Sequence, residues 1–434
     1  MTQRASGHVR WYLVSWLFVL SAVSFLDRVN ISVAGNSIAT DFGLTDIQLG
    51  WVFSAFLWGY ALFQTLGGWL GDSLGPRLVL TAGVVWWGIF TALTAAVSPK
   101  ICGAVFVFVL VRFLLGAGEA ILYPASNQFV SRWIPTQERG MANGLIFAGV
   151  GVGAGSAPAI VTYILVHYGW RWSFWISALL GLFVGIVWFL AARDAPETHP
   201  RVSAAELAYI QQGRTLENPP SPRQTSAKEE RRIAWRTILR SKEIWAVTLS
   251  YFCFGYVAWI FFSWFYIYLL KVRGLNLKSS AFYGAFPPLA MVACSLLGGI
   301  VNDQLSRIYG KRVGRCGIAA FALFLAAILL VIGSRTASPH LASIVLASGA
   351  GALYLAQSSY WSVTADIAGP RAGSASGFMN MGAQLGGAVT ALLTPVIALH
   401  LGWTYPFIIA AALSAAGALA WLTVDPSRQF VQSA

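Results

Sequence analysis

Charged residues are scarce in this chain. Only 10% of its 434 residues are Asp, Glu, Lys or Arg, and acidic residues are the rarer kind, at 16 against 29 basic ones. Apolar residues make up 57% of the chain, and the mean hydropathy is +0.65. Since soluble domains carry about a quarter of charged residues, the composition excludes an ordinary soluble protein. It indicates an integral membrane protein.

Residues that build disulfides, metal centres and catalytic sets are also few. The four cysteines lie in or beside apolar segments without paired spacing, and the five histidines fall at ends or loops. No two histidines have the spacing of metal ligands. No serine, histidine and carboxylate set or nucleotide loop can be assembled. We therefore expect no metal, no cofactor and no enzymatic activity.

Long apolar stretches recur along the whole chain. A run of 18 or more such residues can cross a hydrocarbon core of about 30 Å as a helix. Twelve runs meet this criterion, at 11–35, 47–70, 78–97, 101–131, 139–164, 173–192, 244–272, 279–301, 314–334, 340–366, 372–399 and 402–423. The first is too long and too charged for a cleavable signal peptide. The sequence predicts an all-α protein with twelve transmembrane helices.

One long polar segment, 193–243, divides these spans six and six. Its prolines and mixed charges are typical of a linker, with a short helix expected from Ala204 to Gln212. The predicted organisation is an N-terminal six-helix bundle at 1–192, a cytoplasmic linker at 193–243 and a C-terminal six-helix bundle at 244–434.

Basic residues are distributed unevenly among the loops. The linker and the other even-numbered loops hold most of them, and the odd-numbered loops hold few. By the positive-inside bias, both termini are expected in the cytoplasm, in a bacterial-type inner membrane. The positive charge is thus explained by the orientation of the chain in the membrane. No nucleic-acid partner is expected, because no basic patch is interleaved with aromatic residues on a soluble module.

The two halves carry matching stretches at separations of 231 to 233 residues. The pairs are "GGWLGDSLG" (67–75) with "GGIVNDQLS" (298–306), "YGWRWSFWISA" (168–178) with "LGWTYPFIIAA" (401–411), and "ERGMANG" (138–144) with "RAGSASG" (371–377). Three matches in register indicate a two-fold repeat of six-helix bundles. In transporters built this way, the binding site lies near the midplane between the repeats.

The stretch "GGWLGDSLGPR" between spans two and three resembles the loop signature of the major facilitator superfamily. The matching residues are Gly68, Asp72, Gly75 and Arg77. Ser73 departs from the pattern, because an arginine is usual there. A carboxylate at Asp72 can accept hydrogen bonds from a neighbouring helix terminus and latch the bundles. The resemblance implies gating roles for Asp72, Arg77 and Asp303.

A narrower resemblance lies in "RFLLGAGEAILYPASNQFVSRWIPTQERGMANG" (112–144), together with "DRVNIS" (27–32). These stretches are similar to the anion:cation symporter family, which includes sugar-acid permeases and sialin-like organic-anion carriers. The resemblance covers essentially the whole chain.

Four ionisable residues lie well inside the predicted spans: Asp27, Arg28, Arg112 and Glu119. Each costs about 2.5 to 3.5 kcal/mol at a helix centre even on the lenient insertion scale. Arg112 and Glu119 are two turns apart, about 10 Å along the axis, so we expect Arg112 to pair with Asp27 instead. Arg28, about 100° around the helix from Asp27, is then free to face a central cavity. A static ion-pair network that locks the helices is the alternative.

The family resemblance assigns roles to these charges. It implies that Arg28 holds the carboxylate of the substrate, that Asp27 and Glu119 carry protons, and that Arg112 belongs to their charge network. A carboxylate in a low-dielectric bundle beside an arginine can also titrate near neutral pH on physical grounds alone.

Polar and aromatic residues of other spans are candidates for contacts with the part of a ligand that Arg28 does not hold. The resemblance places contacts in spans ten and eleven, which favours Ser358, Trp361 and Asn380, and we add Tyr60 and Tyr256. Helix packing explains any one of them equally well. In span five, the stretch "GLIFAGVGVGAGSAP" (144–158) offers no polar side chain before Ser156, which suggests a ligand smaller or less hydroxylated than a hexonate. Asp366 is interpreted as a helix-end or gate residue.

The hypothesis is a proton-coupled symporter of organic anions that works as a monomer by alternating access. Its expected substrates are sugar acids or related carboxylates. The alternatives are a proton antiporter or anion exchanger that exports small organic compounds, and a transporter-like receptor. Arg28 facing the cavity argues against cationic cargo, and the short linker argues against a receptor.

Overall fold

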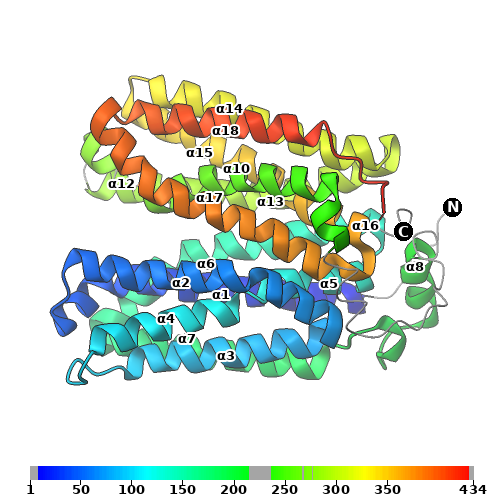
Figure 1. The fold of residues 1–434 in the computed structure, drawn as a ribbon, viewed down its shortest axis with the longest axis horizontal. Helices are drawn as coiled ribbons and strands as arrows, with labels where there is room; N and C mark the ends of the chain where they lie inside the picture. The colour runs from blue at the N-terminus through cyan, green and yellow to red at the C-terminus, as the bar shows by residue number, and fades with distance from the viewer. Residues whose placement is uncertain (1–7, 215–235, 266–267, 276, 430–434) are drawn as a thin grey trace.

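The computed structural model describes residues 8–214, 236–265, 268–275 and 277–429, and these contain helices and no strand. The N-terminal bundle consists of α1 (Val9–Phe42), α2 (Asp46–Leu74), α3 (Pro76–Ala96), α4 (Ala104–Glu119), α5 (Leu122–Trp133), α6 (Arg139–Tyr168) and α7 (Trp170–Ala191). The C-terminal bundle consists of α10 (Lys242–Ser263), α12 (Leu277–Gly284), α13 (Phe286–Tyr309), α14 (Ile318–Arg335), α15 (Pro339–Leu355), α16 (Gln357–Ala368), α17 (Ala372–Leu401) and α18 (Thr404–Trp421). The two bundles lie side by side with their helices nearly parallel (Figure 1).

Ten stretches of the described residues are long and apolar enough to cross a bilayer. One of them, 339–401, contains α15 and α16 and then α17, which run in opposite directions. The 29-residue α2 crosses beside them without reaching the hydropathy of the ten. Within the described residues, the prediction of twelve crossings in two bundles is confirmed.

Two predicted spans are broken at matching places in the two halves. Span four divides into α4 and α5 at Ala120–Ile121, and span ten divides into α15 and α16 at Ala356. Pro124 lies four residues beyond Ala120 and offers no N–H to its carbonyl, which explains the first break. The spans predicted at 101–131 and 340–366 are present, and each contains a break in its helix.

The linker packs against one end of the molecule, which we call the linker end, and the opposite end is the far end. Its helix α8 (Ala204–Arg214) covers the predicted stretch from Ala204 to Gln212. Arg10 at the start of α1 donates to Glu206 of α8 at 3.1 Å and to Glu138 at 3.0 Å. The remainder of the predicted linker, 215–235, lies outside the described residues. These ion pairs fix the described part of the linker to the N-terminal bundle.

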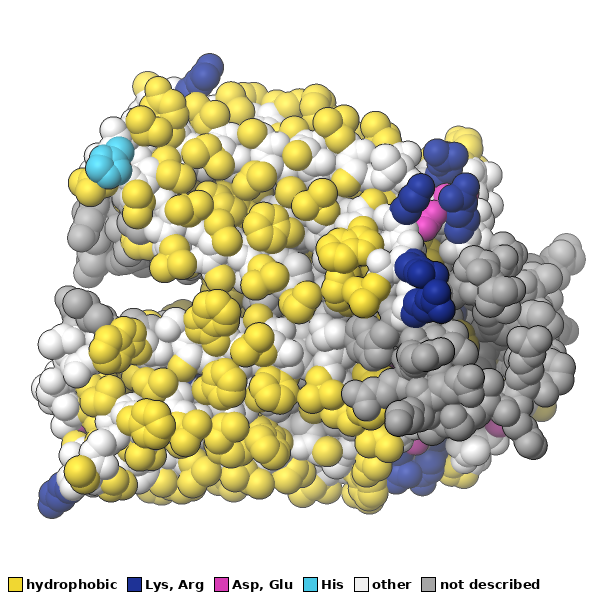
Figure 2. Space-filling view, viewed as in Figure 1, with side chains coloured by type: hydrophobic (Ala, Val, Ile, Leu, Met, Phe, Trp, Pro, Cys, Tyr) yellow, Lys and Arg dark blue, Asp and Glu magenta, His cyan; other side chains and the backbone are white. Residues whose placement is uncertain are grey.

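The bundles touch at the linker end and separate at the far end (Figure 1). The Ser295 hydroxyl on α13 donates to the Gly144 carbonyl on α6 at 3.0 Å, and the Asn380 amide on α17 donates to Gln64 on α2 at 3.0 Å. Figure 2 shows a cleft between the bundles at the far end, an outer surface covered by apolar side chains, and basic side chains gathered near the linker end of this face.

Candidate functional site

A close approach between α2 and α4 positions the buried charges. Gly116 on α4 packs directly on the backbone of α2, where an added Cβ would lie 2.1 Å from the Phe56 carbonyl oxygen. Because no side chain separates the helices, residues one turn to either side of the contact reach α1 and α2 at once. Arg112 and Glu119 occupy these positions and are almost fully buried.

Arg28 and Glu119 form an ion pair between α1 and α4. The Arg28 Nε donates to the Glu119 Oε1 at 2.6 Å, and the Ser24 hydroxyl donates to the same oxygen. Ser24 and Arg28 are one turn apart on α1, so both face α4. The Glu119 Oε2 and the Arg28 Nη2 are buried without a hydrogen-bond partner among the described residues. The pair thus uses one oxygen of the acid and part of the donor fork.

Aromatic rings enclose the Arg28 guanidinium. Its carbon lies 4.1 Å from the ring centroid of Tyr60 and 4.6 Å from that of Phe25. The Phe56 ring lies 5.4 Å from the Arg28 guanidinium and 5.1 Å from that of Arg112. Ring faces attract cations and also exclude water. One tenth of the Arg28 side chain remains exposed, so the ion pair is not sealed.

One expectation about pairing was wrong. Asp27 does not pair with Arg112: its Oδ2 accepts from the Thr91 hydroxyl on α3 at 2.7 Å, and no ion pair within the described residues joins it to Arg112. Glu119, for which the sequence offers no obvious close partner, forms its ion pair with Arg28. The reason is the turn of α1, which points Asp27 toward α3 and Arg28 toward α2 and α4.

The four charges nevertheless form one group. Asp27 lies close enough to Arg112, Arg28 and Glu119 to interact with all three electrostatically. The Arg112 Nε and Nη1 are buried and make no hydrogen bond within the described chain. Two positive and two negative side chains balance in a region where net charge is expensive.

The bundles meet directly below this group, toward the linker end. Tyr123, one turn beyond Glu119, stacks with Phe147 at 5.0 Å, and both rings contact Trp361 of α16, at 5.9 Å and 5.1 Å. The hydrogen bond between Asn380 and Gln64 lies one turn beyond Tyr60. These contacts form a floor that joins the bundles. The predicted residues Tyr60, Trp361 and Asn380 are thereby brought to one region.

The other two predicted contact residues are less informative. Ser358 on α16 is fully buried, and its hydroxyl has no hydrogen-bond partner within the described residues. Tyr256 on α10 is 2% exposed. Their predicted contact with a ligand stays a prediction.

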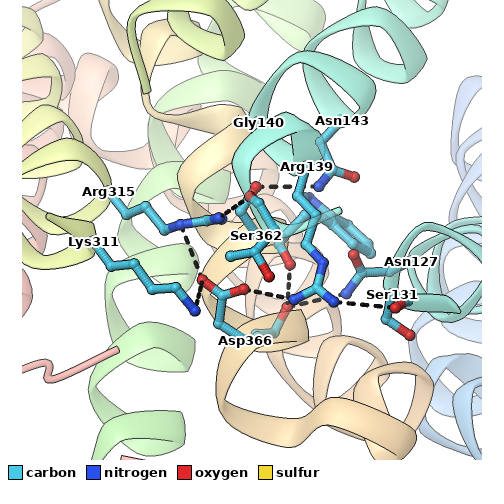
Figure 3. Close-up of polar contacts among 12 residues, drawn as sticks. Asn127, Ser131, Arg139, Gly140, Asn143, Lys311, Arg315, Ser362 and Asp366 are labelled. Carbon is cyan, nitrogen blue, oxygen red and sulfur yellow. Dashed lines mark hydrogen bonds and ion pairs between the residues drawn. The ribbon is translucent and has the colours of Figure 1, made fainter. Parts of the chain in front are cut away.

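A second charged cluster joins the bundles at the linker end (Figure 3). Asp366 on α16 accepts a hydrogen bond from Arg139 at the start of α6 at 2.6 Å. It also forms ion pairs with Arg315 at 3.0 Å and Lys311 at 3.8 Å. Arg315 also donates to the Thr136 carbonyl across the interface at 2.7 Å. The cluster agrees with the interpretation of Asp366 as a gate residue, since it holds cations from both halves.

Two further carboxylates cap helices of the opposite bundle. Asp72 at the end of α2 accepts from the backbone N–H groups of Gly373 and Ser374 at 2.9 Å and 2.8 Å. Asp303 on α13 accepts from those of Gly140 and Met141 at 2.9 Å and 2.7 Å. An anion at a helix N-terminus is stabilising. The predicted hydrogen bonds from Asp72 to a neighbouring helix terminus are confirmed, and the repeat places Asp303 in the same arrangement.

Comparisons with known proteins agree with this architecture. The model of the Major Facilitator Superfamily matches residues 17–391 and 305–433. The chain belongs to the major facilitator superfamily. It is 35% identical over 425 residues to the probable sulfoacetate transporter SauU of Cupriavidus necator, covering 96% of this chain and 94% of that one. It is 28% identical to the probable galactarate/D-glucarate transporter GudP of Bacillus subtilis, covering 90% and 85%.

Solved structures of this superfamily share the fold. The proton:xylose symporter XylE matches with a TM-score of 0.74 at 15% identity, covering 96% of each chain. The E. coli fucose:proton symporter FucP matches with a TM-score of 0.72 at 18% identity, covering 95% of this chain and 97% of that one. The curated relatives fit the anion:cation symporter family predicted from "DRVNIS" and residues 112–144. The chain is a transporter and not an enzyme.

Arg77 contacts its own half of the molecule, and its gating role stays a prediction. Its backbone N–H donates to Asp194 at 2.8 Å, and its Nε donates to the Phe189 carbonyl at 2.9 Å. Both partners belong to the N-terminal bundle and the segment that follows it. Arg77 therefore braces α3 against α7 and, within the described residues, makes no hydrogen bond or ion pair with the other bundle.

Arg139 and Arg315 were not predicted as site residues. Their charges were interpreted as topological, because basic residues near span ends are common on the cytoplasmic side. Burial distinguishes them, since Arg139 is 2% exposed and Arg315 is fully buried. The position of Arg139 in the "ERGMANG" repeat was the one sequence signal that pointed to it.

Proposed function

We propose that the protein is a proton-coupled symporter of small organic anions. The observation that carries this proposal is the ion pair between Arg28 and Glu119, in which the guanidinium keeps a free donor and some exposure while Glu119 keeps one bare oxygen. A substrate carboxylate matches the planar donor fork of an arginine. Protonation of Glu119 would weaken its hold on Arg28 and release that fork to the substrate.

Charge balance supports the coupling. The buried group of Asp27, Arg28, Arg112 and Glu119 carries no net charge, so an entering anion leaves one uncompensated negative charge for each charge it brings. Buried unpaired charge is costly. One proton on Glu119 restores the balance for a monoanion, and a second on Asp27, whose Oδ1 is also buried without a partner within the described residues, would do so for a dianion.

The surroundings of Arg28 favour a compact substrate. Tyr60, Phe25 and Phe56 line the guanidinium, and the Tyr123, Phe147 and Trp361 rings close the floor. Span five contributes glycines and no polar side chain near this level. The relatives include a probable sulfoacetate transporter and a probable galactarate/D-glucarate transporter. We propose sugar acids or smaller related acids as the substrate class.

Alternating access would depend on the contacts at the linker end. If this end faces the cytoplasm, as the basic residues predict, the cleft in Figure 2 opens to the outside. The Asp366 cluster and the Asp72 and Asp303 caps then form the closed inner gate. We propose that occupation of Arg28 by substrate lets the floor and these contacts break, which exposes the site to the cytoplasm of a plasma-membrane protein.

Uptake into proteoliposomes tests this function. With an inwardly directed proton gradient, radiolabelled sulfoacetate or glucarate should accumulate above its outside concentration, and a protonophore should abolish the accumulation. Exchange of anions without a response to the gradient would replace symport by anion exchange. Proton-driven export of a lipophilic cation without anion uptake would contradict the proposal and favour the antiporter.

A further inference from the structure

A second cavity lies on the outer side of the N-terminal bundle at the linker end. It has a volume of about 620 Å³ and is lined by the start of α1, the end of α7 and the segment that follows α7. Its basic lining includes Arg193 and Arg201, and its apolar lining includes Val9, Tyr12 and Leu190. The cavity is separate from Arg28 and from the interface between the bundles, so transport as proposed above leaves it without a role.

The arginines on the basic side of the cavity have N–H donors that form no hydrogen bond within the described residues. Arg193 uses only Nη1 to donate to the Leu190 and Ala192 carbonyls, at 3.1 Å and 2.7 Å. This contact holds the guanidinium at the cavity while its other N–H groups stay available. Arg201 is exposed and makes no side-chain hydrogen bond within the described residues. Two such forks suit a phosphate group.

His199 fixes the segment that carries these arginines. Its Nε2 donates to the Ala191 carbonyl at 3.0 Å, and its Nδ1 accepts from the Arg201 backbone N–H at 3.2 Å. Burial lowers the pKa of His199 below its ordinary value, so the ring is neutral at pH 7 and both hydrogen bonds are satisfied. His199 therefore adds no positive charge to the cavity, whereas Arg193 and Arg201 do.

The apolar side continues onto the surface that faces the bilayer. Leu190 is 66% exposed and Tyr12 is 48% exposed. Tyr12 also packs edge-on against Trp16, one turn further into the span, at 6.4 Å. Tyr and Trp favour the level where lipid headgroups meet the hydrocarbon. A ligand in this cavity would place a polar part beside the arginines and an apolar part along α1 and α7.

We infer that this cavity binds the headgroup of an anionic phospholipid, with the phosphate on Arg193 and Arg201 and an acyl chain against the exposed apolar side chains of α1 and α7. Basic pockets between transmembrane helices on the cytoplasmic side take such headgroups. A free phosphate would meet the arginines but would leave these apolar side chains uncovered. A zwitterionic lipid would cover them but would bring a cation beside the two arginines. The inference does not depend on the transported substrate.

Native mass spectrometry of the purified full-length protein with phosphatidylglycerol tests this assignment. Near a membrane surface each basic residue contributes about a fivefold gain in affinity for anionic lipid. Arg193→Gln with Arg201→Gln should therefore weaken binding about thirtyfold. The control, Arg236→Gln with Arg240→Gln, removes the same charge from exposed positions before α10 and should leave binding unchanged. Phosphatidylcholine should bind all variants equally.

Loss of the Arg193 contacts can weaken the end of α7, so Arg201→Glu provides a second variant. Its side chain is exposed and bonds nothing within the described chain, and it should lose phosphatidylglycerol while keeping the thermal stability of the parent. Equal phosphatidylglycerol binding by all variants would overturn the inference. Displacement of the lipid by millimolar inorganic phosphate would also overturn it, because the cavity would then be a site for a soluble anion.

Discussion

Asp27 and Arg28 are neighbours in the sequence but serve different partners. Adjacent residues of a helix point about 100° apart, so Asp27 meets Thr91 on α3 and Arg28 meets Glu119 on α4. The Arg28 ion pair is the element that links proton and substrate in the proposed mechanism. An ionised Glu119 and a substrate carboxylate therefore compete for the Arg28 guanidinium, because it cannot hold both.

Replacement of Arg28 by lysine tests the role of the donor fork. Lysine keeps the charge but cannot bind a carboxylate bidentately. A charged hydrogen bond contributes about 1.5 to 3 kcal/mol, so Arg28→Lys should weaken binding by one to two orders of magnitude. Thermal-shift titration with mono- and dicarboxylic acids measures this. Arg335→Lys, at an exposed position, is the control, and an unchanged affinity in Arg28→Lys would remove Arg28 from the substrate site.

The sequence identified the four buried charges but not their pairing. An ionisable residue inside an apolar span is visible from hydropathy alone. The face of α1 that meets α4 depends on how α2 and α4 pack, and Gly116 sets that packing because it allows the two backbones to contact. Residue spacing within a single helix cannot predict such a contact between helices. The prediction that Asp27 pairs with Arg112 failed for this reason, whereas the membership of all four residues in one group was correct.

At the scale of elements, close helix contacts at glycines position the residues of the site. Gly116 meets the backbone of α2, but Gly155, in the far half of α6, has nothing within 4 Å of an added Cβ. The same substitution at these two helix positions should therefore have opposite effects.

Gly116→Ala should destabilise the protein, because its Cβ would collide with the Phe56 carbonyl. Gly155→Ala should be neutral or stabilising by up to about 1 kcal/mol, because alanine is the better helix former. Thermal unfolding of the purified variants in one detergent provides the comparison. A Gly116→Ala protein as stable as Gly155→Ala would show that α2 and α4 do not pack as described.

The helix caps are expected to hold the linker end closed. Asp72→Asn and Asp303→Asn each remove a carboxylate from a helix N-terminus, at about 1 kcal/mol apiece, and the two sites lie on different helices and should add. Spin labels on Cys102 and on Ala337→Cys, with the other cysteines changed to serine, report the far end. The double variant should gain a population with a shorter distance as the far end closes.

The matched control for the caps is Asp425→Asn, a carboxylate that bonds Ser427 and Arg428 in its own segment. Its distance distribution should equal that of the parent. If the double variant also keeps the parent distribution, the caps do not contribute to the gate. The sequence predicted the Asp72 hydrogen bonds from a helix-end argument, but Arg139 and Arg315 of the neighbouring cluster became visible only through their burial.

At the scale of the whole molecule, hydropathy and the internal repeat were sufficient to predict two six-helix bundles. The hydropathy signal derives from the bilayer, which requires apolar runs of a minimum length, and the matched stretches show that the two halves share one plan. The breaks in spans four and ten were missed because backbone breaks inside a bundle leave hydropathy unchanged. The sequence could not predict that the linker end is closed, because the same sequence adopts both the state closed at this end and the state open at it.

The orientation of the molecule is a prediction that reporter fusions can check. Basic residues at the linker end predict that both termini lie in the cytoplasm. Alkaline phosphatase fused after Lys100, at the far end, should be active, and a fusion at the C-terminus should be inactive. A fluorescent protein fused at the C-terminus should be fluorescent, because it would lie in the cytoplasm. Activity of the C-terminal phosphatase fusion would invert the assignment of the inner gate.

The most direct test of the account is the transport behaviour of Glu119→Gln in proteoliposomes. The amide cannot take up a proton and cannot hold Arg28 as an anion. We predict that substrate counterflow persists while accumulation driven by a pH gradient is lost. Glu243→Gln, which alters an acid paired with exposed Arg428, should accumulate substrate like the parent. Full gradient-driven accumulation by Glu119→Gln would contradict the central claim that Glu119 couples the proton to the substrate through Arg28.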